Sequence, residues 1–333
     1  MPHLEMRGPG MRRREFLGVL GGAMAWPLAA RAQQPLPVVG FLNGGFSDSY
    51  TQQVVAFRQG LNESGYVDGE TVTIDFRWAN GRAEDLLPLA NELAKRRVAA
   101  IVTSGSAAAL AAKSATATIP IIFNVTDPIR LGLVKSINRP EGNATGVDVL
   151  AGELEPKRFG LLRELVPSME SIAFLVNPTS PVSPLQTRRM EDAAQRVGVE
   201  LKTFRATGQG DLEAAFARLV QQRPDGLVVA ADPFFNTRRH ELVALAARHS
   251  IPAIYEWREF VEAGGLMSYG PSLKDAYRQI GVYAGRILRG AKPVDLPVIR
   301  PTKFEFVINL KTSKAFGLAV PVSMQLLADD VIE

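Results

Sequence analysis

The sequence predicts an α/β protein of two similar lobes, each built around a parallel β-sheet. Short apolar runs typical of buried strands alternate with helical patterns along most of the 333 residues, an order that places helices on both faces of a sheet. The order of elements then recurs: "IPIIFNVTDP" begins at Ile119, and the similar segment "IPAIYEWREF" begins at Ile251. A repeat this long favours two related lobes over a solenoid, whose repeats are shorter.

The first half of the chain supplies the elements of one lobe. Apolar residues recur at helical spacing at Val54, Val55, Phe57 and Leu61, between runs short enough for strands. Gly65 follows that helical pattern, where a C-cap often has glycine. We expect strands over residues 36–43, 70–79, 98–106 and 119–127, and helices over residues 49–66, 83–97 and 107–115.

The second half repeats this plan in the same order, and the C-terminal quarter adds a helix, a strand and a short helix. We expect strands within residues 170–181, 199–206, 225–233, 251–257 and 302–318, and helices over residues 185–200, 211–224, 238–250 and 275–290. The last of these helices is amphipathic. One of its sides carries Ala276, Ile280, Tyr283 and Ile287.

Two segments are expected to connect the lobes. Residues 143–150 have the pattern of a strand that leaves the first lobe, and residues 264–272 that of a strand that returns to it. Crossing segments of this kind act as hinges, so the lobes are expected to close around a ligand. The predicted division is an N-terminal segment of residues 1–32, one lobe of residues 36–147 plus 269–300, and a second lobe of residues 148–268 plus 301–333.

The N-terminal segment has the three parts of a secretory signal peptide. Basic residues precede a short apolar stretch over residues 16–30, and the small-x-small site Ala30-Arg31-Ala32 predicts cleavage before Gln33. A membrane span needs about 20 apolar residues, so this stretch is too short to be one. We therefore expect the mature protein to lie in the periplasm.

The sequence allows two interpretations of the export route and two of the start of translation. Arg13 and Arg14, followed by Glu15-Phe16-Leu17, match the twin-arginine export pattern. A general secretory signal that carries several arginines is the alternative. Met11 suits the start of a signal peptide better than Met1 does.

Composition excludes several classes of protein. The chain has no cysteine, which removes disulfides and thiolate chemistry, and its three histidines (His3, His240 and His249) are too few for a histidine-rich metal site. Removal of residues 1–32 takes away five arginines and two acidic residues, which leaves a net charge near +1 and no electrostatic footprint for nucleic acid. Motifs of hydrolases, zinc peptidases and nucleotide-binding proteins are absent, so we expect no enzyme and no cofactor.

The ends of the predicted strands carry polar side chains. In open α/β sheets ligands bind beyond the carboxyl ends of the strands, so two facing lobes would line one cleft with these ends. Phe46, Phe234 and Trp257 lie among them, either as part of a cleft wall or as plugs of the core. The candidate ligand-binding residues are Asn43, Ser47, Ser104, Gly105, Ser106, Ala107, Thr126, Asp127, Asn177, Asp232, Tyr255, Glu256 and Tyr269.

Two pairs of candidates suggest the chemistry of the ligand. Ser104 and Ser106 lie at a predicted helix start, where unpaired N–H groups and the helix dipole favour a carboxylate; alternatively, these serines only cap the helix. Asp127 and Asp232 suit a ligand ammonium, or they are helix N-caps, because each precedes a proline. An amino acid would use both pairs, whereas an aromatic or aliphatic carboxylate without an amine would use only the serines.

Several motifs together resemble one protein family. The segments "PVVGFLN", "IDFRWA", "IPIIFNVTDP" and "SYGPS" are similar to those of the periplasmic solute-binding proteins of ABC importers, in the branch that includes tryptophan- and tyrosine-binding members. The resemblance covers nearly all of the mature chain. It implies a type I fold, with two Rossmann-like lobes joined by crossing hinge strands, and delivery of a small-molecule ligand to an ABC permease in the inner membrane. Glu141 stands where many members have glycine.

The resemblance also implies where the ligand binds. Members of this branch have binding residues at the turn that corresponds to Ser104–Ala107, at the Thr126-Asp127 turn, and at the facing strand ends of the second lobe. We expect a monomer that holds no metal. The alternative function is a sensory binding protein that presents its ligand-bound form to a membrane receptor, because it would use the same cleft.

Overall fold

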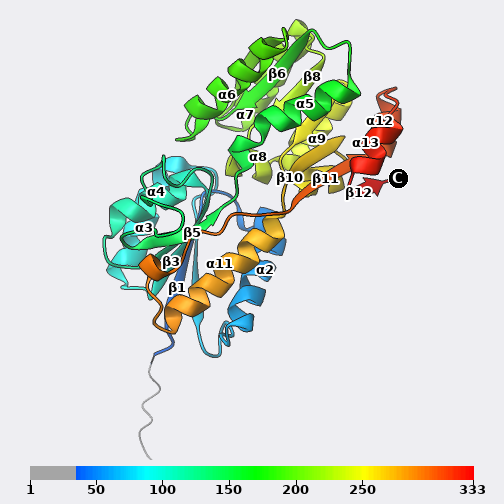
Figure 1. Ribbon diagram of the computed structural model, residues 1–333. Helices are drawn as coiled ribbons and strands as arrows, with labels where there is room; N and C mark the ends of the chain where they lie inside the picture. The colour runs from blue at the N-terminus through cyan, green and yellow to red at the C-terminus, as the bar shows by residue number, and fades with distance from the viewer. Residues whose placement is uncertain (1–34) are drawn as a thin grey trace, which may run out of the picture. The chain divides into compact units, whose positions relative to one another are not determined.

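The chain folds into two mainly parallel β-sheets that are covered by helices (Figure 1). The structure is a computed structural model that describes residues 35–333. The signal peptide expected over residues 1–32 lies outside the described residues. Among the residues described, no helix is both long and apolar enough to cross a membrane.

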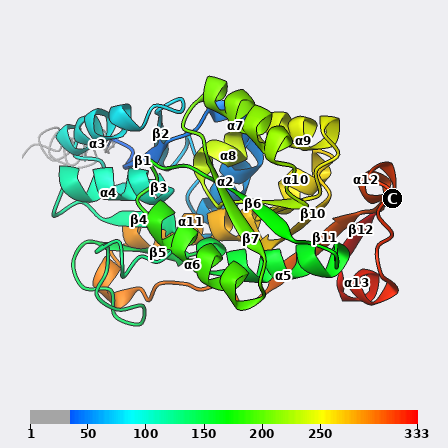
Figure 2. The same ribbon diagram turned by 90° about the horizontal axis from the view of Figure 1, so that it is seen from above.

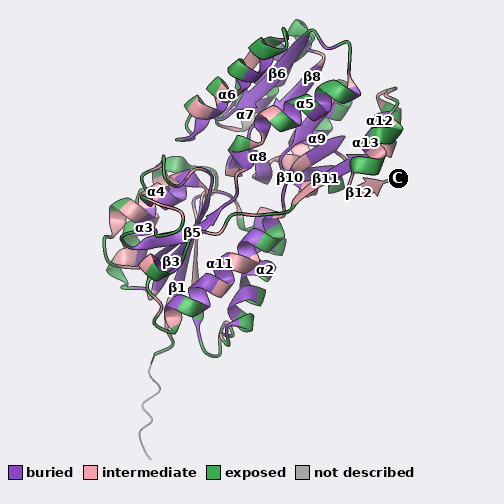
Figure 3. Ribbon diagram, viewed as in Figure 1, coloured by how far each residue is buried: buried purple, intermediate pink, exposed green. Residues whose placement is uncertain are grey.

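The first sheet is entirely parallel and has the strand order β2-β1-β3-β4-β5. Its central strands are buried along their whole length (Figure 3), as near-continuous aliphatic runs predict for a sheet with helices on both faces. The strands are β1 (Val38–Asn43), β2 (Thr73–Trp78), β3 (Ala100–Ser104), β4 (Ile121–Val125) and β5 (Ala144–Asp148). The helices between them are η1 (Ser47–Tyr50), α2 (Thr51–Glu63), η2 (Ala83–Asp85), α3 (Leu86–Lys95) and α4 (Ser106–Ala115).

The first sheet is completed by a helix from the far end of the sequence. Helix α11 (Leu273–Leu288) packs against α2 and against β3, β4 and β5 (Figures 1 and 2). The two helices cross where glycines face each other, since a Cβ on Gly281 would lie 2.2 Å from the Phe57 carbonyl oxygen and 3.0 Å from the Gly60 Cα. We call the first sheet with α2, α3, α4 and α11 the first lobe.

The second sheet has the strand order β12-β11-β10-β9-β8-β6-β7, in which only the β10–β11 pair is antiparallel. Its strands are β6 (Ser171–Val176), β7 (Glu200–Arg205), β8 (Gly226–Val229), β9 (Ala253–Tyr255), β10 (Met267–Pro271), β11 (Phe304–Asn309) and β12 (Asp330–Ile332). Its helices are η3 (Ala151–Glu153), α5 (Glu155–Leu165), α6 (Ser183–Arg196), α7 (Gln209–Gln222), α8 (Pro233–Thr237), α9 (Arg239–Arg248), α10 (Arg258–Glu262), α12 (Leu310–Ala315) and α13 (Val322–Leu327). This sheet with these helices is the second lobe.

The internal repeat appears as matching topology. The order β1-α2-β2-α3-β3-α4-β4 recurs as β6-α6-β7-α7-β8-α9-β9, and the sheet orders β2-β1-β3-β4 and β7-β6-β8-β9 correspond strand for strand. The two Ile-Pro segments therefore lead into β4 and β9, which are equivalent strands. The α/β class with parallel sheets, predicted from the alternation of elements, is confirmed.

The chain passes between the lobes three times. It leaves the first lobe after β5, returns between β10 and α11, and crosses again between η4 (Pro293–Asp295) and β11. The expected lobe boundary at residue 269 lies inside β10, because Tyr269 pairs with Phe306 and Pro271 pairs with Phe304 in the second sheet. The return crossing therefore begins only after Pro271.

Candidate functional site

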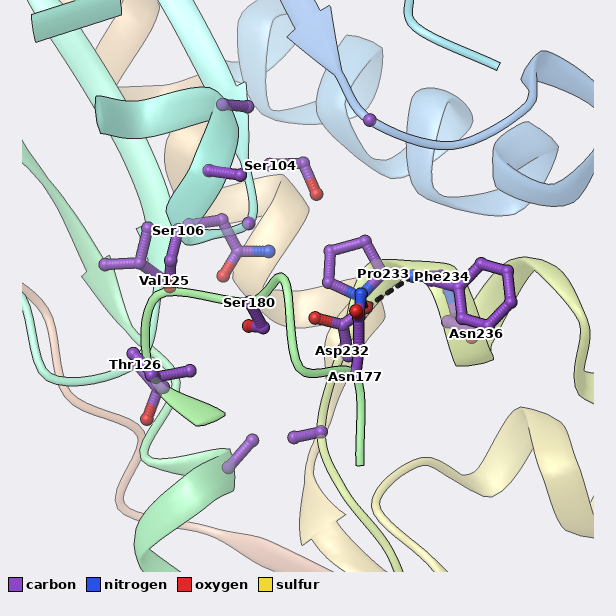
Figure 4. A pocket seen from close by; sticks show the side chains of 18 of the residues that line it. Ser104, Ser106, Val125, Thr126, Asn177, Ser180, Asp232, Pro233, Phe234 and Asn236 are labelled. Carbon is purple, nitrogen blue, oxygen red and sulfur yellow. Dashed lines mark hydrogen bonds between the residues drawn. The ribbon is translucent and has the colours of Figure 1, made fainter. Parts of the chain in front are cut away.

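A cavity of about 130 Å³ lies at the carboxyl ends of strands from both sheets. The first lobe contributes the ends of β3 and β4 and the start of α4, and the second lobe contributes the segments after β6 and β8. Figure 4 shows Ser104 and Ser106 on one side and Asn177 and Asp232 on the other. This is the position at which open α/β sheets bind ligands.

The start of α4 presents unpaired N–H groups to this cavity. Its N-cap is Gly105, which adopts a positive φ of +85°. Because glycine has no side chain, it cannot cap the helix. The first N–H groups of a helix have no partner within the helix, and those of Ser106, Ala107 and Ala108 belong to residues on the cavity wall. This end of the helix also carries the positive end of the helix dipole, so it suits an anion.

Ser104 is already committed to a hydrogen bond inside the protein. Its hydroxyl lies 2.5 Å from the hydroxyl of Tyr277 on α11, and both side chains are buried. Burial raises the pKa of Tyr277 well above its ordinary value, so the phenol stays protonated. The Ser104 hydroxyl therefore does not cap α4 and is already hydrogen-bonded before a ligand binds. This bond connects the end of β3 to α11.

Asp232 is the acidic group of the cavity wall. Its Oδ1 accepts hydrogen bonds from the Phe234 N–H at 2.9 Å and from the Asn177 Nδ2 at 3.0 Å, so it caps α8 and also faces the cavity. Burial raises its pKa, while these donors act in the opposite direction. Asn177 is itself held by Thr179, whose N–H and hydroxyl donate to its Oδ1. The two roles considered for Asp232, cap and cavity group, therefore coexist.

The cavity wall otherwise lacks charged groups. Of the described residues that line it, Asp232 is the single carboxylate, and none is lysine, arginine or histidine. Aromatic rings of Tyr50, Phe234, Trp257 and Tyr277 provide apolar surface. A ligand with several negative charges, such as a phosphate ester, would have no basic side chain to pair with here.

The structure brings about half of the candidate residues together. Ser104, Gly105, Ser106, Ala107, Thr126, Asn177 and Asp232 line the cavity. The candidates that do not line it are Asn43, Ser47, Asp127, Tyr255, Glu256 and Tyr269.

Each residue outside the cavity has a different environment. Asn43 is buried and accepts a hydrogen bond from the Gly45 N–H at 2.7 Å, and Ser47 is exposed beside Asp48. Tyr255 stacks on Phe260 in the core at a centroid distance of 4.6 Å. Asn43 pairs with Ser104 in the sheet but lies behind the wall, whereas Ser47 is at the start of η1 and Tyr255 is part of the core.

Glu256 turns into the interior of the second lobe. It is fully buried, and neither of its carboxylate oxygens has a hydrogen-bond partner among the described residues. Burial raises its pKa to about 8, and the nearby guanidinium of Arg158 lowers it. Arg158 is also fully buried and donates to the carbonyl oxygens of Ala151 at 2.8 Å and Tyr269 at 3.3 Å, so it joins η3 to β10 within the second lobe.

Asp127 and Tyr269 also lie outside the cavity. Asp127 has φ +55° and faces Arg189 of α6, with 3.5 Å between its Oδ2 and the Arg189 Nη2. The ring of Tyr269 packs against those of Phe304 and Phe306 at the β10–β11 pair. Neither side chain is oriented toward a ligand in the cavity.

Several wall residues were not among the candidates from the sequence. Tyr277 follows Leu273 by four residues on α11, a spacing that predicts burial on the same face but does not indicate that its hydroxyl reaches a cavity in the first lobe. Tyr50 directly precedes α2, and the sequence pattern predicts only that it begins a surface helix. The polar and aromatic wall residues outside the candidate set are Tyr50, Asn124, Thr179, Ser180, Thr207, Phe234, Asn236, Trp257 and Tyr277.

The lobes touch each other beside the cavity. The Ser49 hydroxyl donates to the Thr237 carbonyl at 3.3 Å, and the Arg239 Nη1 donates to the Ser49 carbonyl at 3.2 Å. The Gln53 Nε2 donates to the Glu259 Oε1 at 3.3 Å. Because these hydrogen bonds join residues of different lobes, the lobes are in contact at this side of the cavity.

Comparison with known proteins assigns the family. The family model of the ABC transporter substrate binding protein matches residues 39–332. The chain belongs to this family. The predicted resemblance and the predicted type I fold are therefore confirmed, and the protein is a substrate-binding protein of the ABC transporter family rather than an enzyme.

Individual relatives of this family member share most of its length. A tyrosine-binding protein from Clostridioides difficile (strain R20291) is 29% identical over 277 residues, which cover 83% of this chain and 78% of that protein. An ABC domain in complex with L-Trp from Streptococcus pneumonia has a TM-score of 0.81 at 26% identity, and the match covers 89% of this chain and 100% of that one. A conserved domain protein from Vibrio cholerae O1 biovar El Tor strain N16961 shares the fold, with a TM-score of 0.83 at 23% identity over 89% of this chain and 99% of that one.

Proposed function

We propose that this substrate-binding protein captures a free amino acid in the cavity between its lobes and delivers it to an ABC permease in the inner membrane. The proposal is carried by two groups with opposite charge preference on the wall of one cavity. The uncapped start of α4 suits a carboxylate, and Asp232 suits an ammonium. An amino acid presents both charges at once, whereas a ligand with one charge leaves one of these groups unmatched.

Each group of the site has a specific role in this proposal. The N–H groups of Ser106 and Ala107 hold the carboxylate, and Asp232 receives the ammonium. Asn177 keeps Asp232 in position through the 3.0 Å hydrogen bond. The rings of Tyr50 and Trp257 on the cavity wall favour an apolar or aromatic side chain. The tyrosine-binding relative and the L-Trp complex support tyrosine and tryptophan as the first ligands to test.

A carboxylate without an amine is the less favourable ligand. It would enter a cavity that contains the Asp232 carboxylate and no basic side chain among the described wall residues. Two like charges in a partly desolvated site repel each other, and the start of α4 alone would have to offset this repulsion. The amino acid removes the conflict because its ammonium lies between the two carboxylates.

Export completes the proposal. We infer that residues 1–32 direct the chain to the periplasm by the twin-arginine route and are removed, and that the mature chain acts as a monomer. The two lobes would then close around the ligand, divided as expected except that residues 269–271 belong to β10 of the second lobe. Size-exclusion chromatography with light scattering of the periplasmic fraction tests both the cleavage and the monomer.

Calorimetric titration of residues 33–333 with matched ligands tests the proposed site. L-tyrosine carries both charges, tyramine lacks the carboxylate, and 3-(4-hydroxyphenyl)propanoate lacks the amine. We expect L-tyrosine or L-tryptophan to bind at least tenfold more tightly than either single-charge analogue, since a charge-assisted hydrogen bond contributes roughly 1.5–3 kcal/mol. Equal binding of tyrosine and the propanoate would remove Asp232 from the site. Absence of binding across all 20 amino acids would overturn the ligand class.

A further inference from the structure

An ion pair joins the two lobes next to the cavity without lining it. The Arg189 Nη2 of α6 lies 3.5 Å from the Asp127 Oδ2, and their side chains are 26% and 21% exposed. Asp127 directly follows Thr126, which is on the cavity wall, whereas neither member of the pair is. The pair therefore connects the first lobe to the second at a turn that also borders the ligand site.

The turn holds the Asp127 carboxylate in a fixed orientation. Its Oδ1 accepts a hydrogen bond from the Arg130 N–H at 3.3 Å, which leaves Oδ2 for Arg189. The backbone of Asp127 has φ +55°, a left-handed conformation that aspartate and asparagine tolerate better than most residues do. Asp127 therefore loses little side-chain entropy when the ion pair forms.

The same turn is tied to the crossing segments. The Asp127 N–H donates to the Asp148 Oδ1 at 3.1 Å, and Asp148 is the last residue of β5, at the first crossing. The Asp148 Oδ2 accepts from the Arg300 Nε at 3.0 Å, and Arg300 lies on the third crossing. Asp148 is completely buried, whereas the side chain of Arg300 is 45% exposed, so the carboxylate links the turn to the surface of the third crossing. The position of Asp127 is thus coupled to the segments that must bend when the lobes move.

We propose that Asp127 and Arg189 form a latch that stabilises the closed arrangement of the lobes and acts on ligand affinity without touching the ligand. This inference rests on the proposed function, because closure has a role only if the cavity holds a ligand. The apparent ligand affinity is proportional to the fraction of free protein that is closed, so it rises when that fraction rises. A contact made only in the closed arrangement raises that fraction.

The latch is weak enough to be reversible. Partly exposed ion pairs contribute roughly 0.2–1 kcal/mol, which corresponds to a change of about 1.4- to fivefold in the ratio of closed to open protein. Arg189 also lies near Glu153 of its own lobe: burial raises the pKa of Glu153, and the charge of Arg189 opposes this rise. Opening therefore leaves Arg189 with an acidic neighbour, so the lobes can release the ligand to a permease.

Two charge-removing variants and one control test the latch. Asp127→Asn keeps an oxygen for the Arg130 N–H and tolerates the left-handed backbone, so it removes only the charge. Arg189→Gln removes the other member. Arg188→Gln is the matched control, because Arg188 is the next residue on α6, is exposed, and has no carboxylate within ion-pair distance in the part of the chain that the structure describes.

The readout is the distance between the lobes. The chain has no cysteine, so Lys95→Cys on α3 and Asp192→Cys on α6, both at exposed positions, accept a pair of spin labels. We expect Asp127→Asn, Arg189→Gln and the double variant each to lower the short-distance population, without and with L-tyrosine. Each should weaken tyrosine binding by at most about fivefold. Arg188→Gln should behave as the wild type.

The outcomes separate the latch from the proposed ligand. Identical distance distributions in the wild type and Asp127→Asn, with and without tyrosine, would overturn the latch. Additive effects of the two single variants in the double variant would also overturn it, because partners of one bond cannot lose it twice. If no amino acid changes the distances in the wild type while Asp127→Asn still opens the free protein, the proposed function fails and the latch stands.

Discussion

Gly105 at the start of α4 lies against Pro233 at the start of α8, so that a Cβ on Gly105 would stand 2.5 Å from the Pro233 Cγ. The two residues belong to different lobes, and the absence of a side chain lets the lobes approach this closely. The glycine therefore serves two purposes, since it also leaves the N–H groups of α4 without a side-chain cap.

Gly105→Ala should hold the lobes apart. We expect ligand affinity to fall at least tenfold and the radius of gyration with ligand, measured by small-angle scattering, to stay near that of the free protein. Gly132→Ala is the control, because Gly132 also has a positive φ, of +70°, but has nothing within 4 Å of its Cβ position. Alanine is strained at both positions, by about 1–3 kcal/mol at Gly105 (φ +85°, ψ +156°) and by about 1–2 kcal/mol at Gly132. Equal ligand affinity in the two variants would contradict the role of the Gly105–Pro233 contact.

Asp232→Asn should remove the preference for an amine. Asparagine still accepts the hydrogen bond from the Phe234 N–H and so keeps the cap of α8, while the charge that receives the ammonium is lost. We expect tyrosine affinity to fall by tenfold or more and the melting temperature to change little. Affinity for 3-(4-hydroxyphenyl)propanoate should stay the same or rise. Calorimetric titration measures both ligands, and parallel losses for the two would place the ammonium elsewhere.

The buried carboxylate of Glu256 should make the stability of the protein depend on pH. Its pKa is raised from 4.5 to about 8 by burial, so the folded state binds a proton that the unfolded state releases. The stability from this proton is fully present below about pH 4.5 and is lost as the pH rises through about 8. The loss approaches about 1.4 kcal/mol for each pH unit where only the folded state keeps the proton.

Glu256→Gln removes this proton without a large change in shape. We expect the melting temperature of the variant to fall less than that of the wild type between pH 5.5 and pH 8.5, in denaturation followed by circular dichroism. Glu155, whose pKa burial raises to about 7, titrates in both proteins and contributes to the remaining slope. Parallel curves for the two proteins would show that Glu256 does not change its charge over this range.

The crossing of α2 and α11 should be intolerant of a single methyl group. Gly281→Ala would place a Cβ 2.2 Å from the Phe57 carbonyl oxygen, which belongs to the backbone and cannot move aside. We expect a loss of about 3 kcal/mol or more in the free energy of unfolding. Gly160→Ala on α5, where nothing lies within 4 Å, is the control and should stabilise the protein by about 0.5–1 kcal/mol. Urea titration compares the two variants.

Much of the fold is predictable from local pattern. Alternating apolar runs and helical spacings indicate the parallel sheets, and the repeat of the Ile-Pro segments indicates two lobes with the same topology. The place of β10 is not predictable in this way, because its pairing with β11 depends on hydrogen bonds to a strand more than 30 residues later. Tyr269 therefore reads as a crossing residue although it belongs to the second sheet.

The cavity is predictable only in part, since its wall depends on which way side chains face. Ser106 and Asp232 follow strands and open helices, and this position places both on the wall. Glu256 also follows a strand, yet it points to Arg158 in the interior. No spacing in the sequence indicates that contact, because the partner lies on α5, about 100 residues earlier. Tyr277 lies on α11, which is more than 160 residues from β3 in the sequence but packs against it. Local pattern therefore does not predict that Tyr277 lines the cavity.

Because α11 belongs to the first lobe, this lobe cannot be completed until long after its strands have been synthesised. All five strands of the first sheet are complete at Asp148, but the helix that covers β3, β4 and β5 begins only at Leu273. A nascent chain thus carries an unfinished first lobe while the whole of β6 to β10 is made. The second sheet is complete only when β11 and β12 have been made. Both lobes are therefore unfinished while residues 149–272 are synthesised, and exposed apolar surface makes the nascent chain prone to aggregation during that interval.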